Sequence, residues 1–306
     1  MGTEAAPIAS PPRAIDPSLR IGGARLAVSD LGRSVDFYAR ALGLPLIARD
    51  EDGATLGPDR ERPTLALAGL EHPSAAQPHS TGLFHLAFLH PSRSALAGTI
   101  ERVIAARWPI HGASDHGVSE ALYLSDPDGL GVEIYADRPR EQWPRPAAGE
   151  GVEMVTRPLD LDDLLAQAPL EPPSEMPAEV VLGHVHLKVA GVPRAAAFYR
   201  DVLGFVEQAH MPSAAFLAAS GYHHHIGLNS WQSRGARPAA DSAPGLRLIA
   251  FELSSPAELA ALEDRLSDAD GGRLMVDRRP GRVYVSDPDG NRLMFAVVPA
   301  AGAPRA

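Results

Sequence analysis

The 306-residue chain contains no cysteine, so it can form neither a disulfide framework nor a thiolate metal site. Any bound metal ion must therefore rely on imidazole and carboxylate ligands. Lysine is scarce, and the net charge of −10 argues against nucleic acid as a partner. The sequence also lacks any run of about eighteen apolar residues, and its N-terminus lacks the basic start and apolar core of a signal peptide. We therefore expect no membrane partner and a cytoplasmic location.

Apolar residues and histidines are well represented. Hydrophobic residues make up 45% of the chain and charged residues 22%, which is the composition of a globular protein. A chain of this length can form two domains, each with its own core. The twelve histidines are the candidate metal ligands and acid–base groups.

The chain repeats itself at an offset of 161 residues (284 − 123). The segment YLSDPDGLGVEIYAD at 123–137 has a near-copy, YVSDPDGNRLMF, at 284–295. In both copies a DPDG turn precedes alternating residues, which predicts a turn feeding a strand. The alignment places Glu133 opposite Met294, so one copy has a carboxylate where the other has a thioether. At the same offset, 189–205 matches 28–44, including the dipeptide FY and a following glycine.

Each copy contains two units in which a strand, a helix and about three further strands follow one another. In the first unit, residues 21–28 alternate as a strand, Ser29 and Asp30 are typical helix N-caps, and Gly43 ends a segment with helical spacing. One such unit leaves a sheet face bare, so pairs of units are expected to curl around a cavity. We predict an α+β fold with two modules, at 21–137 and 181–298. A linker at 138–180 joins them and contains one short helix near 159–167. A disordered arm at 1–20 precedes the first module, and a tail at 299–306 follows the second.

These motifs resemble those of the vicinal oxygen chelate superfamily, which includes glyoxalase I, bleomycin-resistance proteins and extradiol dioxygenases. The resemblance covers nearly all of residues 21–298 and implies four βαβββ units in two tandem modules, with curled mixed sheets enclosing a metal cavity. The segments TGLFHLAFLHPSR, LGHVHLKV and GYHHHIGLNSW further resemble the two-module catechol 2,3-dioxygenases of the CatE type.

The resemblance implies metal ligands on the first strand of one unit and on the first and last strands of its partner unit. In units two and three, the matching residues are His85, Glu133 and His184. In units one and four, the matching residues are Gly23, Leu248 and Met294. One metal site is therefore predicted, where units two and three face each other. Two imidazoles and one carboxylate suit Fe(II) with O₂ as co-substrate, and Mn(II) is the alternative ion.

The pairing of the units is left open by the sequence. The better-known extradiol enzymes carry all three ligands in the C-terminal half, whereas here two of them lie in the N-terminal half. The units must therefore pair differently, and the site forms either within one chain or across a homo-oligomer.

The resemblance also implies acid–base groups. A histidine in the segment Tyr222–His225, which we place on the last strand of unit three, would move protons; His224 matches best. His225 is the alternate and could instead be a fourth metal ligand, and a solvated bend is the alternative for the whole segment. Tyr123 matches a tyrosine that hydrogen-bonds the substrate oxygen, although packing against the turn would also explain it. His116 resembles a supporting histidine of the same enzymes.

These features predict an extradiol ring-cleaving dioxygenase that acts on a small aromatic diol of the catechol type. A glyoxalase-type isomerase or lyase is the first alternative, but its second carboxylate is missing near Gly227. A metal-free protein that sequesters an aromatic compound is the second alternative. The substrate and the oligomeric state are left open.

Overall fold

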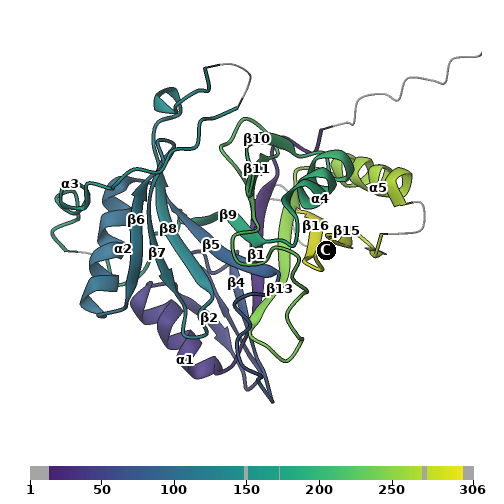
Figure 1. Cartoon of the computed structure of the whole chain (residues 1–306). Helices are drawn as coiled ribbons and strands as arrows, with labels where there is room; N and C mark the ends of the chain where they lie inside the picture. The colour runs from purple at the N-terminus through teal and green to yellow at the C-terminus, as the bar shows by residue number, and fades with distance from the viewer. Residues whose placement is uncertain (1–13, 148–150, 172, 271–273, 299–306) are drawn as a thin grey trace, which may run out of the picture.

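The computed structural model describes residues 14–147, 151–171, 173–270 and 274–298. Within these residues the chain forms four successive units of one strand, one helical segment and three strands, which confirms the predicted α+β fold. All sixteen strands belong to one continuous, curled sheet. The strands lie between α2 and α3 on one side and α4 and α5 on the other (Figure 1). None of the described helices is long and apolar enough to cross a bilayer.

The elements of the N-terminal half form units one and two, followed by a connecting segment. Unit one consists of β1 (Arg20–Val28), α1 (Leu31–Asp36), the π-helical turn η1 (Phe37–Ala41), β2 (Leu46–Arg49), β3 (Gly53–Leu56) and β4 (Leu65–Gly69). Unit two consists of β5 (Gly82–His90), α2 (Arg93–Ala105), β6 (Ile110–Asp115), β7 (Ser119–Ser125) and β8 (Gly131–Asp137). The connection contains the 3₁₀ turn η2 (Arg140–Gln142) and α3 (Leu161–Leu165).

The C-terminal half repeats this order. Unit three consists of β9 (Val181–Lys188), α4 (Val192–Ala197), the π-helical turn η3 (Phe198–Val202), β10 (Val206–Met211), β11 (Ala214–Ala218) and β12 (Ile226–Asn229). Unit four consists of β13 (Gly245–Leu253), α5 (Pro256–Asp270), β14 (Val276–Arg279), β15 (Arg282–Ser286) and β16 (Arg292–Val297).

The first helix begins and ends as its sequence predicts. The Asp30 side chain accepts a hydrogen bond from the backbone N–H of Arg33, as an N-cap residue does. Gly43 follows the helical segment with φ of 77°, a left-handed conformation that only glycine adopts at little cost. The same change of direction occurs at Gly204, with φ of 88°, at the end of the helical segment of unit three.

The units pair across the two halves of the chain. β5 of unit two pairs antiparallel with β9 of unit three, and β1 of unit one pairs antiparallel with β13 of unit four. A single residue pair, Ile21 with Leu182, joins β1 to β9 and links the two paired bodies. The metal-ligand positions of units two and three are therefore brought together within one chain.

Units within the same half are joined by buried tyrosine–aspartate hydrogen bonds. The Tyr38 hydroxyl donates to Asp126 at 3.2 Å, and the Tyr199 hydroxyl donates to Asp287 at 3.1 Å. Both tyrosines are fully buried, and burial raises the pKa of Asp126 to about 6. Each bond connects the FY motif of one unit to the DPDG turn of the next. The repeated motifs thus join neighbouring units of the fold. Hydrogen bonds of this kind contribute about 1 kcal/mol or more each to the free energy of unfolding.

Parts of the predicted arm and linker contact the rest of the fold. Residues 14–20 are packed against the fold: Ile15 is fully buried, and its backbone N–H donates to Gly204. Of the predicted arm, only 1–13 lie outside the described residues, as does the tail at 299–306. The predicted linker helix forms over Leu161–Leu165, and part of the linker runs along the cavity described below.

Candidate metal centre

Three ligand-type side chains meet on neighbouring strands. In the parallel pair β5–β8, Ala87 lies opposite Glu133, and in the antiparallel pair β5–β9, Ala87 lies opposite His184. Glu133 and His184 therefore flank the small side chain of Ala87. His85 lies two residues before Ala87 on β5 and so faces the same side of the sheet. The strand register thus brings together three residues from distant parts of the sequence.

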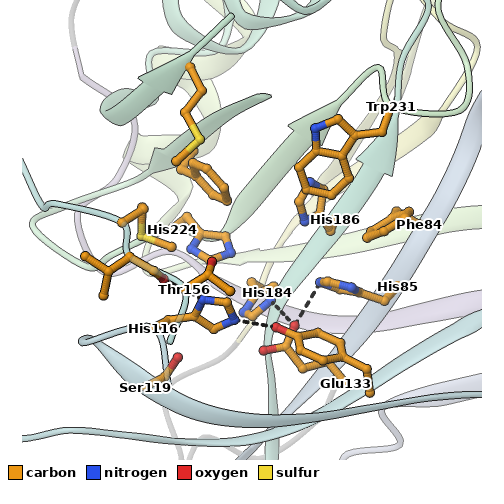
Figure 2. A pocket seen from close by; sticks show the side chains of 15 residues that line it. Phe84, His85, His116, Ser119, Glu133, Thr156, His184, His186, His224 and Trp231 are labelled. Atoms are coloured by element: carbon orange, nitrogen blue, oxygen red, sulfur yellow. Dashed lines mark hydrogen bonds and ion pairs between the residues drawn. The ribbon is translucent and has the colours of Figure 1, made fainter. Parts of the chain in front are cut away.

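The three side chains converge on one point, as Figure 2 shows. Nε2 of His85 lies 2.9 Å from Oε2 of Glu133, and Nε2 of His184 lies 3.1 Å from the same oxygen. All three residues are buried, with at most 5% of their surface exposed. Their ligand atoms lie within 4.8 Å of one another, and no other group of three such residues occurs among the described residues.

The chemistry of this group fits a divalent metal ion. His85 makes no hydrogen bond through Nε2 within the described residues, although that atom is buried beside a carboxylate. Burial lowers the pKa of His184 to about 4, so its ring is neutral near pH 7, the form that binds metals. Burial tends to raise the pKa of Glu133, but the two imidazoles directed at it outweigh burial and hold the pKa well below its usual range. Glu133 is thus the anionic member of the group, and His184 is a neutral one.

The equivalent positions between units one and four hold no such group. Gly23 and Leu248 line a separate cavity of about 220 Å³, where β1 and β13 pair. Met294 lies on β16, next to β13. None of these three side chains offers a nitrogen or oxygen ligand, so the two paired bodies share a frame but differ at the metal-ligand positions.

Tyr123 and His116 form a hydrogen-bonded pair beside Glu133. Tyr123 lies opposite Glu133 in the β7–β8 ladder, and its hydroxyl is 2.6 Å from Nε2 of His116. Nδ1 of His116 is 2.8 Å from the carbonyl oxygen of Val155, which can only accept. In a neutral ring Nδ1 therefore carries the proton, and Nε2 accepts from the Tyr123 hydroxyl. Burial and the nearby Glu133 carboxylate raise the pKa of Tyr123 well above its usual value, so its hydroxyl remains protonated.

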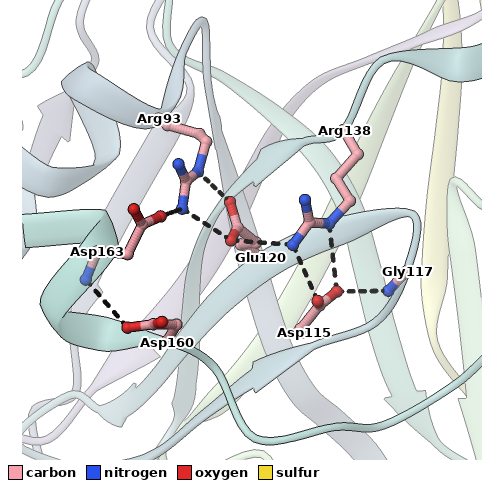
Figure 3. A network of polar contacts seen from close by, with 7 residues as sticks. All are labelled: Arg93, Asp115, Gly117, Glu120, Arg138, Asp160 and Asp163. Atoms are coloured by element: carbon pink, nitrogen blue, oxygen red, sulfur yellow. Dashed lines mark hydrogen bonds and ion pairs between the residues drawn. The ribbon is translucent and has the colours of Figure 1, made fainter. Parts of the chain in front are cut away.

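The turn that carries His116 is fixed by a network of ion pairs (Figure 3). Glu120 on β7 is buried and contacts both Arg93 and Arg138. Arg138 is also 2.8 Å from Asp115 at the end of β6, and Arg93 is 2.9 Å from Asp163 on α3. Two arginines thus compensate the buried carboxylate. The network connects α2, β6, β7 and the linker helix around the His116 turn.

The structure corrects the conformation predicted for the three adjacent histidines. They form a bend before β12 in which His223 and His224 are buried and His225 is half-buried, so they lie neither on the last strand of unit three nor in a solvated segment. The β12–β9 ladder begins only at Ile226, opposite Val185. The ring of His224 lines the cavity, and its centroid lies 4.1 Å from the ring centroid of His184. His225 lines a different cavity, and its Nδ1 accepts from the backbone N–H of Ala219, so its position does not support the role predicted for it.

The metal-ligand group opens onto a cavity of about 330 Å³ whose walls are mostly aromatic and apolar. The lining side chains that the sequence analysis did not identify are Phe84, Ser119, Met154, Val155, Thr156, His186, Met211, Phe216 and Trp231. Three of these, at 154–156, come from the segment predicted to be only a linker, and no sequence pattern indicated their role.

His186 is the imidazole of the cavity wall that the sequence analysis missed. It is buried, and its Nε2 has no hydrogen-bond partner among the described residues. It lies two residues after His184 on β9, so strand alternation could have placed it on the same face. Its ring packs against Phe84 and Trp231, with centroids 5.2 Å and 5.6 Å away.

Comparison with known proteins agrees with this geometry. Residues 20–134 and 181–295 match the family described as the Glyoxalase/Bleomycin resistance protein/Dioxygenase superfamily. The chain belongs to this superfamily. A relative, the Catechol-2,3-dioxygenase of Bacillus subtilis (strain 168), is 42% identical over 254 residues, which cover 81% of this chain and 88% of the relative. The resemblance inferred from the sequence is therefore confirmed.

Solved structures show a similar fold. Glyoxalase I from Zea mays has a TM-score of 0.55 at 18% identity, covering 92% of each chain. The cppA protein from Streptococcus pneumoniae TIGR4 has a TM-score of 0.52 at 12% identity, covering 90% of this chain and 96% of the other. At these identities the likeness concerns the fold alone.

We predict that the chain binds one equivalent of a divalent metal and that Glu133→Gln abolishes tight binding. The amide keeps the shape of the side chain but removes the only anionic ligand. Metal content after dialysis against a defined Mn(II) or Fe(II) buffer measures the effect.

The matched control is Met294→Gln, which alters the equivalent position in the other paired body and should leave one equivalent bound. Two equivalents in the unmodified protein, or full retention in Glu133→Gln, would contradict the assignment.

Proposed function

We propose that the protein is an extradiol ring-cleaving dioxygenase that acts on a catechol-type aromatic diol with non-haem Fe(II) and O₂. The observation that supports this most is the His85–Glu133–His184 group at the base of an aromatic-walled cavity. A relative that is 42% identical and named Catechol-2,3-dioxygenase supports the same reaction class.

In this proposal His85, Glu133 and His184 hold the metal ion. Two imidazoles and one carboxylate suit Fe(II), with Mn(II) as the alternative, and leave coordination positions for exogenous ligands. When bound, the ion supplies the Lewis acidity and redox chemistry that dioxygen insertion requires. The protein contributes a single negative charge at this point, because both histidines bind in their neutral form.

The cavity selects a flat, largely apolar ring. Phe84, Phe216 and Trp231 line it, and the Phe84 and Trp231 rings lie 5.3 Å apart, edge to face. Aromatic walls of this kind contact a planar ring over a large area and exclude water. The described residues that line the cavity include no arginine or lysine, so the cavity does not favour a strongly anionic substrate.

His224 is the proposed proton acceptor for a substrate hydroxyl. Burial, and then the neighbouring histidines, lower its pKa well below its usual value, so the ring is neutral and can accept a proton. It lines the cavity beside His184. Because the Tyr123 hydroxyl proton is directed to His116, the Tyr123 oxygen can accept a hydrogen bond from a second substrate hydroxyl.

A glyoxalase-type reaction is disfavoured by the space around Gly227. This residue lies opposite His186 in the parallel β9–β12 ladder. A Cβ added at Gly227 would lie 2.8 Å from Cγ of the His186 ring. The second carboxylate of a glyoxalase-type site is therefore absent, and the His186 ring occupies the space that it would enter.

We predict that protein reconstituted anaerobically with Fe(II) and then given catechol and air produces a yellow, ring-opened semialdehyde. The measurement is the rise in absorbance near the visible edge, together with O₂ uptake. Met294→Gln should match the unmodified protein, whereas Glu133→Gln should be inactive.

If no simple or substituted catechol is cleaved by the Fe(II)-loaded protein, the proposed reaction is wrong. If Glu133→Gln still binds catechols as tightly as the unmodified protein, the metal-free binding alternative is favoured.

Tyr123→Phe should lower kcat/KM by about ten- to a hundredfold, which is the effect of losing one hydrogen bond at a charged centre. The matched control is Tyr284→Phe, its copy in unit four, whose ring contacts Arg279 and is remote from the metal-ligand group. Steady-state kinetics with catechol measure both variants. Equal kinetics for Tyr123→Phe and the unmodified protein would leave Tyr123 with a packing role alone.

A further inference from the structure

A chain of three polar side chains leads from the edge of the fold to the cavity. Nε2 of His223 is 3.0 Å from Oδ1 of Asp137, at the end of β8. Nδ1 of His223 is 2.7 Å from Nδ1 of His224, which lines the cavity. The Asp137 side chain is 23% exposed, whereas His223 is fully buried. The chain therefore runs from a partly exposed carboxylate to the proposed proton acceptor.

The donors and acceptors of this chain can be assigned one after another. The Asp137 carboxylate can only accept, so Nε2 of His223 carries a proton. In a neutral His223 ring Nδ1 is then an acceptor, and the proton between the two rings belongs to Nδ1 of His224. Consequently Nε2 of a neutral His224 ring carries no proton. The carboxylate thus sets the tautomer of a histidine that it does not touch.

The surroundings of His223 hold its ring in place. Its ring centroid lies 4.0 Å from that of Tyr222 and 5.4 Å from that of Trp143. The Tyr222 hydroxyl is 2.9 Å from the Tyr135 hydroxyl; Tyr135 is fully buried and Tyr222 is half-buried. The aromatic contacts leave the His223 ring little freedom to rotate away from Asp137 or His224.

We propose that Asp137 and His223 are positioning residues that fix His224 with its Nδ1 protonated and its Nε2 free to accept a proton from the substrate. The tautomer of neutral rings follows from the contacts alone. Only the use of His224 as a proton acceptor for the substrate rests on the proposed function. A carboxylate that orients a histidine through a hydrogen bond is an established principle of acid–base sites. Here a second imidazole is interposed between the two groups.

The first test reads the tautomer directly and needs no turnover. The full-length chain is labelled with ¹⁵N-histidine, and long-range ¹H–¹⁵N correlation spectra are recorded without metal and with Zn(II), a diamagnetic ion that accepts imidazole and carboxylate ligands. We expect the His224 signals of a neutral ring with Nδ1 protonated and Nε2 unprotonated. In Asp137→Ala and His223→Phe this pattern should be lost. Asp137→Asn should retain it, because the amide oxygen can still accept from His223.

The matched control is His225→Gln. It removes the adjacent histidine, which takes no part in the Asp137–His223–His224 hydrogen bonds and lines a different cavity. It should leave the His224 signals unchanged. A His224 ring protonated on Nε2 in the unmodified protein would overturn the inference, and this result requires no variant to fold. An unchanged His224 tautomer in both Asp137→Ala and His223→Phe would overturn it as well.

The second test uses kinetics of the Fe(II)-loaded protein. Asp137→Ala and His223→Phe should lower kcat by about ten- to a hundredfold with little change in KM, as expected when one charge-assisted hydrogen bond is lost. The kcat of Asp137→Asn should lie between those of these variants and that of the unmodified protein. The kcat of His225→Gln should equal that of the unmodified protein. Equal kcat in all four variants would overturn the positioning role. If the unmodified protein cleaves no catechol, the proposed function fails, whereas the tautomer measurement still decides the inference.

Discussion

The antiparallel pairing of β5 with β9 is the interaction on which the rest of the site depends. It places His184 opposite Ala87, two residues from His85, and the parallel β5–β8 ladder then adds Glu133 on the other side. Without this pairing, His184 in the C-terminal half would not meet His85 and Glu133 of the N-terminal half. A buried carboxylate without partners is costly. The imidazoles offset that cost in the metal-free protein, and the same geometry fits a cation.

The repeated motifs serve the frame, and the differences between the copies serve the site. The Tyr38–Asp126 and Tyr199–Asp287 hydrogen bonds are the same interaction, made once in each half at the 161-residue offset. The metal-ligand positions differ instead. One paired body has two histidines and a glutamate, and the other has glycine, leucine and methionine. Sequence similarity between the halves therefore describes how the units are joined and says little about chemistry.

Much of the fold could be predicted from the sequence, because its signals are local. The N-cap at Asp30, the glycine after the helical segment and the alternating strands each depend on a few neighbouring residues, and the structure contains all of them. Units two and three were predicted to face each other, but whether they do so within one chain could not be predicted, since it depends on long-range strand contacts. Matching repeat positions, together with the family resemblance, identified the three residues that the structure brings together.

The errors at the site arose where the backbone is irregular. Residues 223–225 were placed on a strand, but a bend forms there, in which His223 donates a hydrogen bond to Asp137 and accepts one from His224. At β9, where alternation does hold, it was not applied, and His186 was missed. The linker residues 154–156 reach the cavity through tertiary packing that no local pattern reports.

The central claim is that one metal centre forms within a single chain, between units two and three. Anomalous diffraction from crystals of the metal-loaded protein tests it most directly. We predict one peak per chain, bounded by His85, Glu133 and His184 of that chain. A peak shared between residues of two chains, a peak beside Leu248 and Met294, or no peak at the three residues in fully loaded protein would contradict the account.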